Sequence, residues 1–207
     1  MKERPILFSG EMVKAILEGR KTQTRRVLKT FPCDEAAVKF PYPRMRGNCV
    51  EFHEHPSNEF PMWLYSVPCP YGQPGDRLWV RETLRRDPDA NVWYYAAGKP
   101  EDWVVVTPEN HTESLVWAVH KEGDTCVSIH MPRWASRITL EITKVRIERV
   151  NDISYADCRA EGVDFWNANN PKEWYAKLWN SINKDRGFGW EKNPWVWVLE
   201  FKRVEAA

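Results

Sequence analysis

The chain has 207 residues, enough for one domain with a substantial core, and its 30 basic and 29 acidic residues give a formal net charge of +1. This balance excludes a globally basic nucleic-acid coat, so any contact with a polyanion must be local. Five cysteines, an odd number at irregular spacing, favour a reducing cytosol over a disulfide framework. No run reaches the roughly 18 to 20 apolar residues of a membrane span, so we expect no membrane partner.

The first predicted elements are a strand at residues 6–8 and a helix that ends at Gly19. Ser9 can cap the start of the helix, and glycine is a typical helix-stop residue. The apolar face of this helix comprises Met12, Val13, Ile16 and Leu17.

A short basic segment follows the helix and contains no acidic residue. Its cations are Arg20, Lys21, Arg25 and Arg26. We expect a basic loop here, with a strand from Arg25 to Leu28. Because each charge raises the cost of charging its neighbours, the pattern predicts a lowered pKa for Lys21. In a turn or a helical arc, the Thr24 hydroxyl would lie close enough to the Lys21 amine for both groups to contact one ligand. The segment is either a nucleophile or anion site, or a solvated basic turn.

Residues 30–68 are rich in proline, which predicts an insertion without long regular elements and with at most a small hairpin near Cys49 to Phe52. Potential zinc ligands in and beside this insertion are Cys33, Cys49, His53, His55 and Cys69. Since they contain no Cys-x-x-Cys pair, we interpret them as ordinary loop residues and expect no metal.

The segment from Arg77 to Glu82 follows a turn at Gly75 and predicts a strand. Alternation puts Leu78, Val80 and Glu82 on one face. If this is the core face, Glu82 points inward, where burial would raise its pKa towards the range of a general acid or base. If Trp79 marks the core instead, Glu82 is solvated. The pattern leaves both possibilities open.

The middle of the chain predicts a hairpin, an insertion and a long strand. Val92 to Ala97 and Trp103 to Val106 form the hairpin, and residues 107–127 form a polar insertion. The long strand covers Arg137 to Val150, with a bulge expected near Thr143-Lys144 because the apolar residues change phase there. Before it, His130 and Arg133 are candidates to contact a phosphate or a base, although His130 also fits a hydrogen-bonded structural role.

Two helices and a strand are predicted near the C-terminus. Ser154 and Asp157 resemble a capping box that opens a short helix ending at Gly162. Asn170 and Pro171 predict the start of a second helix. Its expected core-facing stripe comprises Trp174, Leu178, Trp179 and Ile182. Trp195 to Phe201 is apolar on both faces, which indicates a central strand.

Several of these segments resemble a known family. The helix running into Gly19-Arg20-Lys21-Thr22-Gln23-Thr24-Arg25, and the later Gly75-Asp76-Arg77-Leu78-Trp79-Val80-Arg81-Glu82, are similar to the ASCH (activating-signal-cointegrator homology) domain of the PUA-like superfamily, closest to the larger branch carried by phages and prophages. Further similar segments are the Cys69-Pro70-Tyr71-Gly72 turn, Ile129 to Arg137, Gly187 to Trp190 and Asn193 to Trp195. The resemblance implies an α+β fold with a small mixed β-barrel and flanking helices, forming one domain over residues 1–207 with insertions at about 30–68 and 107–127.

The resemblance also implies a cleft for RNA or modified nucleosides. Some members of the family are similar to amidohydrolases acting on N4-acylated cytidine, and others are described as ribonucleases. The lysine, threonine and glutamate that the amidohydrolases use would fall on Lys21, Thr24 and Glu82. We therefore expect these three side chains within a few ångströms of one another.

In the hydrolase hypothesis Thr24 is the nucleophile, Glu82 the acid and base, and Lys21 the group that orients the substrate or stabilises an oxyanion. No cofactor is expected. Candidates for binding the substrate or nucleic acid are Arg20, Arg25, Arg26, Arg81, His130 and Arg133. The alternative is a non-catalytic RNA-binding module, in which the basic loop holds phosphates and some of the twelve tryptophans stack bases.

Overall fold

The computed structural model describes residues 1–29, 42–53, 63–87, 92–97, 103–104, 125–163 and 170–204. The fold is α+β, as predicted. By its contacts the chain forms two compact units, which we describe separately. Unit 1 comprises Met1–Gly19, Arg77–Glu141 and Arg203–Ala207, and unit 2 comprises Arg20–Asp76 and Ile142–Lys202. This division does not test the single-domain hypothesis, which stays a prediction.

The strands form three sheets. The largest has the order β1-β6-β11-β12-β2 and contains the three segments predicted to share a sheet: β6 (Arg77–Arg81), β11 (Thr139–Arg149) and β12 (Trp195–Val204). The order is open, with β1 (Glu3–Leu7) and β2 (Gln23–Val27) as its edge strands. The predicted barrel was therefore wrong, because closure requires hydrogen bonds between the first and last strands of the order.

In unit 1, β1 pairs in parallel with β6, and β6 pairs antiparallel with the beginning of β11. Helix α1 (Gly10–Leu17) lies between β1 and β2 in the sequence and begins after Ser9. It ends before Gly19, whose φ of +74° is a left-handed conformation that glycine adopts without a Cβ clash. Leu78 and Val80 of β6 are buried, and so is Trp79 on the opposite face. Both faces of β6 are therefore covered.

A second sheet in unit 1 has the order β10-β7-β8-β9. Its strands are β7 (Leu84–Asp87), β8 (Val92–Tyr95), β9 (Trp103–Val104) and β10 (Thr125–Cys126). The antiparallel pair β8 and β9 confirms the predicted hairpin. The short helices η2 (Ser128–His130) and η3 (Arg133–Ala135) follow, and a core cluster joins Leu84, Trp93, Tyr95, Cys126, Met131 and Ala135. Most of the predicted 107–127 insertion lies outside the described residues.

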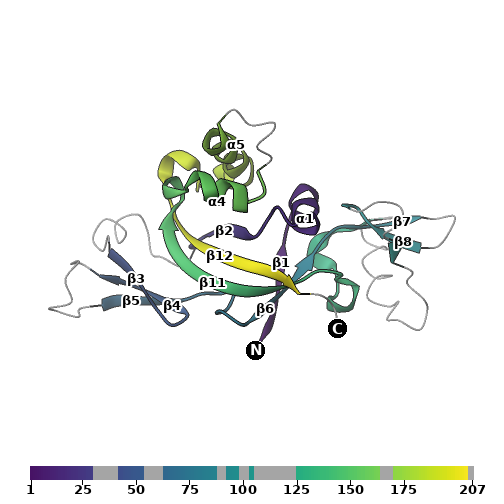
Figure 1. Cartoon of the computed structure of the whole chain (residues 1–207), viewed down its shortest axis with the longest axis horizontal. Helices are drawn as coiled ribbons and strands as arrows, with labels where there is room; N and C mark the ends of the chain where they lie inside the picture. The colour runs from purple at the N-terminus through teal and green to yellow at the C-terminus, as the bar shows by residue number, and fades with distance from the viewer. Residues whose placement is uncertain are drawn as a thin grey trace. The chain divides into compact units, whose positions relative to one another are not determined.

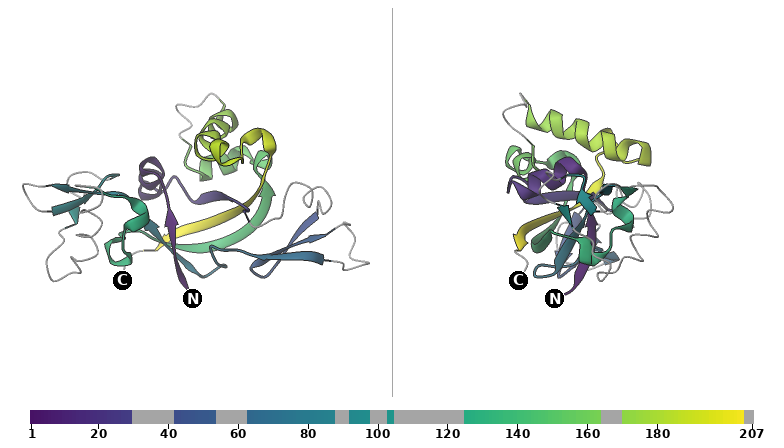
Figure 2. Two further views of the ribbon diagram at one scale, coloured as in Figure 1. Left: turned by 180° about the vertical axis from the view of Figure 1, so that it is seen from behind. Right: turned by 90° about the vertical axis from the view of Figure 1, so that its right-hand side faces the viewer.

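The proline-rich insertion contains the third sheet, which belongs to unit 2. Strands β3 (Tyr42–Arg46), β4 (Cys49–His53) and β5 (Trp63–Pro68) form two antiparallel pairs in sequence order. The small sheet is visible in blue in Figures 1 and 2. The expectation of at most one small hairpin was too modest, because Pro43 lies in the edge strand β3 and Pro68 ends β5, two positions that tolerate proline.

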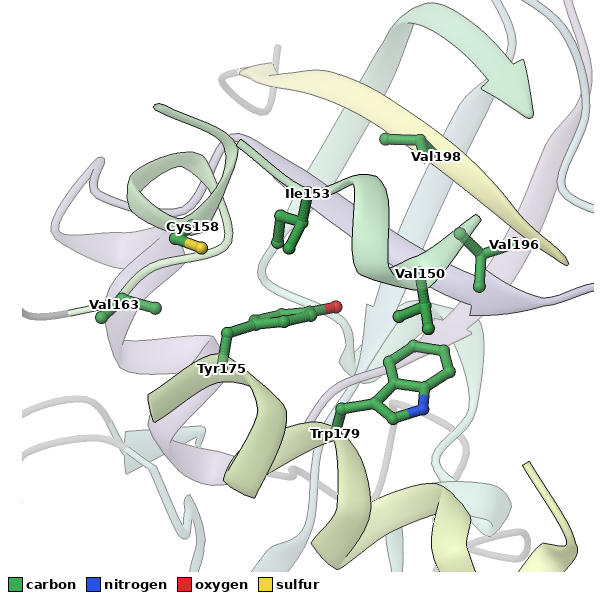
Figure 3. Close-up of a cluster of buried hydrophobic side chains, with 8 residues drawn as sticks. All are labelled: Val150, Ile153, Cys158, Val163, Tyr175, Trp179, Val196 and Val198. Atoms are coloured by element: carbon green, nitrogen blue, oxygen red, sulfur yellow. The ribbon is translucent and has the colours of Figure 1, made fainter. Parts of the chain in front are cut away.

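In the rest of unit 2, two helices pack on strand β12 of the largest sheet. Helix α4 (Tyr155–Ala160) has the predicted capping box between Ser154 and Asp157, and α5 (Pro171–Asn183) begins at Asn170 as predicted. The turns η4 (Val150–Asp152), η6 (Lys184–Arg186) and η7 (Trp190–Lys192) connect these elements. Figure 3 shows the core that results, formed by Val150, Ile153, Cys158, Val163, Tyr175, Trp179, Val196 and Val198.

The predicted core-facing stripe of α5 was partly wrong. Trp179 is buried, but Trp174 and Ile182 are exposed, and Tyr175 takes the inward position one residue after Trp174. The apolar arc of this helix is wide enough to permit either phase, and packing against Val196 and Val198 selects the Tyr175 face.

Two smaller expectations concern the long strand and the membrane. Strand β11 is continuous, with Thr143 and Lys144 both exposed, and the bulge expected there stays a prediction. Among the helices of the described ranges, none is long and apolar enough to cross a bilayer.

The packing of α5 can be tested with two tryptophans on opposite sides of it. Trp179→Ala should lower the free energy of unfolding by about 3–5 kcal/mol, because it opens a core cavity and removes the 2.8 Å hydrogen bond from Nε1 to the Phe188 carbonyl. Trp174→Ala should cost less than about 1 kcal/mol. Urea unfolding followed by circular dichroism measures both values. Equal losses would contradict the observed phase of the helix.

Candidate functional site

The basic segment predicted to be a loop belongs largely to a strand of unit 2. Lys21 forms an antiparallel bridge with Glu161, and the Thr22 amide donates to the Ala160 carbonyl at 2.8 Å. Strand β2 then starts at Gln23, two residues before the predicted strand. The segment therefore has a neighbour on each side. Strand β2 pairs with β12, and the residues before it bond to the end of α4.

Lys21 and Arg25 share one buried carboxylate. The Lys21 Nζ lies 2.7 Å from Glu161 Oε2 and 2.9 Å from the Glu161 carbonyl oxygen, while Arg25 Nη1 lies 3.3 Å from Glu161 Oε1. The side chains of both cations are fully buried. The solvated-turn interpretation is therefore wrong for these two residues.

Further acidic residues surround Arg25. Its Nη2 lies 2.9 Å from Glu148 and 3.3 Å from Asp157. Arg146 extends the network, donating to Glu148, Asp157, Glu200 and the Gln23 amide oxygen. We call Lys21, Arg25, Arg146, Glu148, Asp157 and Glu161 the ionic cluster. It joins β2, β11 and α4 within unit 2.

Burial sets the charge properties of the ionic cluster. Burial lowers the pKa of the Lys21 amine, the Glu161 carboxylate opposes this shift, and Arg26 and Arg25 add to it. The lowering was predicted from the neighbouring cations, but desolvation is its largest cause. For Asp157, burial acts to raise the pKa, but hydrogen bonds from Ser154 and the charge of Arg25 outweigh it and hold the pKa at about 2.

Thr24 occupies the other face of β2. Alternation along the strand puts Gln23 and Arg25, which contact the ionic cluster, on one face and Thr24 with Arg26 on the opposite one. Thr24 is buried. The turn or helical arc that would let Lys21 and Thr24 address one ligand is replaced by this strand. Arg26 is half-buried, and burial lowers its pKa, while the exposed Arg20 donates to the Gly162 carbonyl at 2.9 Å.

Glu82 belongs to unit 1, where it directly follows β6 and is buried. This observation favours the inward orientation over the solvated one. Arg137 Nε and Nη2 each donate to one Glu82 oxygen at 3.0 Å, forming a bidentate pair. The Arg137 guanidinium also lies 3.9 Å from the centroid of the Tyr95 ring, and the Tyr95 hydroxyl donates to the Ala135 carbonyl at 2.7 Å. Because Lys21 and Thr24 lie in unit 2, the joint catalytic site of the three residues stays a prediction.

Two of the predicted binding residues, Arg81 and Arg133, lie beside the Trp79 ring in unit 1, and a third, His130, belongs to η2 of the same unit. The guanidinium carbons of Arg81 and Arg133 lie 4.7 and 6.0 Å from the centroid of its ring. Arg81 also donates to the Ile129 carbonyl at 3.0 Å, which places it beside His130 in η2. We call Trp79, Arg81, Ile129, His130 and Arg133 the Trp79 surface. Ile129 is 54% exposed and the Arg133 side chain 43%, so the surface is accessible.

Glu3 of β1 provides a carboxylate partner for the Trp79 surface. It accepts two hydrogen bonds from Arg133, at 2.9 and 3.3 Å. The hydrogen bond from Arg133 lowers the pKa of Glu3. With Glu3 included, the Trp79 surface contains two guanidinium groups and one carboxylate.

The structure adds residues that sequence reasoning missed. Glu161 and Glu148 carried no local signal, and Asp157 was identified only as a helix cap. Arg137 lies in a segment that resembles the family but had no assigned role. Of the cysteines and histidines considered as potential zinc ligands, Cys33 and His55 lie outside the described residues, and Cys49 and Cys69 are free thiols. Within the described residues, no group of three or more potential ligands could hold a metal ion.

The shared carboxylate makes Lys21 important for stability. Lys21→Met should lower the free energy of unfolding by about 3 kcal/mol, the low end of the cost of breaking a buried pair, because Arg25 still contacts Glu161. Lys14→Met, which removes an exposed cation 3.0 Å from Glu11, should cost less than about 1 kcal/mol. Chemical unfolding of both variants tests this, and a Lys21 effect as small as that of Lys14 would contradict it.

The lowered pKa of Asp157 predicts a pH-dependent contribution to stability. Since its folded value, about 2, is below its ordinary value of 3.8, the unfolded state binds more protons between these values. The stabilisation is therefore present above about pH 4 and is lost as the pH falls through about 2. Asp157→Asn should remove a contribution on the order of 1 kcal/mol, discounted because the side chain is partly exposed. The difference between wild type and variant should shrink from pH 5 to pH 2, whereas the surface variant Glu173→Gln should show a smaller change.

The chain was compared with protein families, curated proteins and solved structures. No family model matches the chain, and no curated protein does. Among solved structures, the chain is similar to an ASCH domain from Lactobacillus crispatus, with a TM-score of 0.43 and 11% identity over 99% of this chain and 81% of the other. It is also similar to protein EF3133 from Enterococcus faecalis, described with the family model DUF984, with a TM-score of 0.42 and 12% identity at the same coverage.

Proposed function

We propose that the protein binds single-stranded RNA, or a nucleoside derived from it, through the Trp79 surface. The observation that carries this proposal is the position of two guanidinium groups over one buried indole ring. Arginine planes stack on bases and donate to phosphates, which makes them common in RNA recognition. The ring fixes the two side chains in place, so less conformational entropy is lost when a ligand binds.

The chemistry of the surface fits an anionic ligand with apolar parts. Arg81 and Arg133 provide two cations, His130 adds a hydrogen-bonding ring, and the exposed Ile129 offers apolar area. A single-stranded nucleic acid presents phosphates and unpaired bases together, which a positively charged surface with flat groups can bind. The sequence resemblance to the ASCH family implies the same class of ligand.

The second candidate is a metal-independent hydrolase that uses Lys21, Thr24 and Glu82. It is favoured by the burial of Glu82 and its bidentate pairing with Arg137, since a fixed carboxylate is what general acid or base catalysis requires. Lys21 would have to act while it contacts Glu161. An alanine variant of Lys21 would also lose stability, so its activity must be compared at equal folded fraction.

Substitutions in the Trp79 surface test the binding proposal. Arg81→Gln and Arg133→Gln should each weaken binding of a short, labelled single-stranded RNA by roughly ten-fold, and each should reduce the slope of log affinity against log salt by about 0.7 for each phosphate that is no longer neutralised. Arg85→Gln is the matched control, because Arg85 is an exposed arginine on β7 of the same unit. Fluorescence anisotropy at several salt concentrations measures these affinities.

Absence of RNA binding by the wild type, or an equal loss in Arg85→Gln, would contradict the proposal. The same preparations should be assayed for hydrolysis of an N4-acylated cytidine and for cleavage of the RNA. Turnover that disappears in Glu82→Gln, at unchanged RNA affinity, would instead support the hydrolase.

A further inference from the structure

The three-stranded sheet of unit 2 has one fully buried face and one face that is exposed along its edge strand β3. Val50 and Phe52 of β4 are fully buried, and the Phe52 ring meets Trp195 of β12 edge to face with centroids 6.0 Å apart. Alternation therefore puts Cys49, Glu51 and His53 on the opposite face. The sheet is anchored through its apolar side, which leaves the other side for a different role.

The edge strand β3 contributes a row of large polar side chains to this open face. The register pairs Tyr42 with His53, Arg44 with Glu51, and Arg46 with Cys49. Directly paired residues on neighbouring strands share a face, so Tyr42, Arg44 and Arg46 lie in line at every second residue. We call these three residues, with Glu51 and His53, the Tyr42 face. Tyr42 is 42% exposed and the Arg46 side chain 76%.

The charges on the Tyr42 face leave it net positive. Glu51 is its one carboxylate, located 3.5 Å from Arg46 and 3.8 Å from the Nε2 atom of His53. The Tyr42 face, as defined by its five described residues, therefore contains two guanidinium groups and one carboxylate. Within the described part of the chain, the buried Nε2 of His53 has no hydrogen-bond partner.

We infer that the Tyr42 face is a second contact surface for single-stranded RNA. Tyr42 stacks on a base, and Arg44 and Arg46 contact the phosphates. Neighbouring side chains in this row are about 6.6 Å apart, a spacing at which each arginine can meet a different phosphate of an extended strand. Aromatic rings on an open sheet face combined with arginines are the features that bind single strands without sequence preference.

The choice of RNA as the ligand rests on the proposed function. The residues of the Tyr42 face were identified independently of it. The Tyr42 face belongs to unit 2 and shares no residue with the Trp79 surface of unit 1. It also lies in the insertion at residues 30–68, a part of the chain for which the motif resemblance implies no role. The two surfaces can therefore be tested independently in one set of measurements.

The experiment measures binding of a short labelled oligouridylate by fluorescence anisotropy. Tyr42→Ala should weaken binding roughly ten-fold, as expected when one stacked base loses its ring, whereas Tyr42→Phe should retain it. Arg46→Gln should weaken binding several-fold and reduce the salt slope by about 0.7. The matched controls are Tyr155→Ala and Arg186→Gln, which remove an exposed tyrosine and an exposed arginine elsewhere in unit 2. Both should bind like the wild type.

Each outcome separates the two surfaces. Normal binding by Tyr42→Ala and Arg46→Gln, with weak binding by Arg81→Gln, would overturn this inference and leave the proposed function intact. The reverse pattern would support the Tyr42 face and overturn the role of the Trp79 surface. Full displacement of the RNA by polyglutamate at equal charge would also overturn the inference, because a surface that stacks bases should prefer the nucleic acid.

Discussion

The contact of Lys21 and Arg25 with Glu161 is the interaction on which unit 2 depends most. Three charged side chains are buried there with almost no exposed area. The attraction between opposite charges offsets the cost of removing each charge from water. The contact ties β2 to the end of α4, which in turn places the helices over β12. A segment that looks like a solvated cationic turn is thus an internal connection between a strand and a helix.

The buried position of Lys21 beside Glu161 changes how the family resemblance applies to the chain. The threonine of the predicted trio lies in strand β2, and the lysine lies two residues before this strand, in a bridge with Glu161. The lysine is also engaged by a carboxylate from α4. Loss of activity in a Lys21 variant would therefore combine a structural and a chemical effect, and only measurements at equal folded fraction separate them. Glu82 has an analogous partner in Arg137, so both charged members of the predicted trio are fixed by residues outside it.

The sequence predicted the features that depend on local signals. The caps at Ser154 and Asn170, the glycine at position 19 and the alternation from Arg77 to Glu82 all concern residues within a few positions of one another. Glu161 could not be identified as the partner of Lys21, because 140 residues separate them and no pattern connects them. The phase of α5 was ambiguous, since Trp174 and Tyr175 are adjacent and only packing against β12 distinguishes them. The three-stranded sheet of the insertion was predicted only as a small hairpin near Cys49 to Phe52, because prolines argue against strands, except at edges and ends.

Pro43 has a further consequence for the behaviour of the chain in concentrated solution. In the described part of the chain, β3 is an edge strand, and such an edge offers its main-chain groups to a strand of another molecule. Proline has no N–H to donate, and the flanking Arg44 and Arg46 repel the same residues of a second copy. Pro43, Arg44 and Arg46 therefore protect this edge from self-association, so the colloidal stability of the chain depends in part on a five-residue strand.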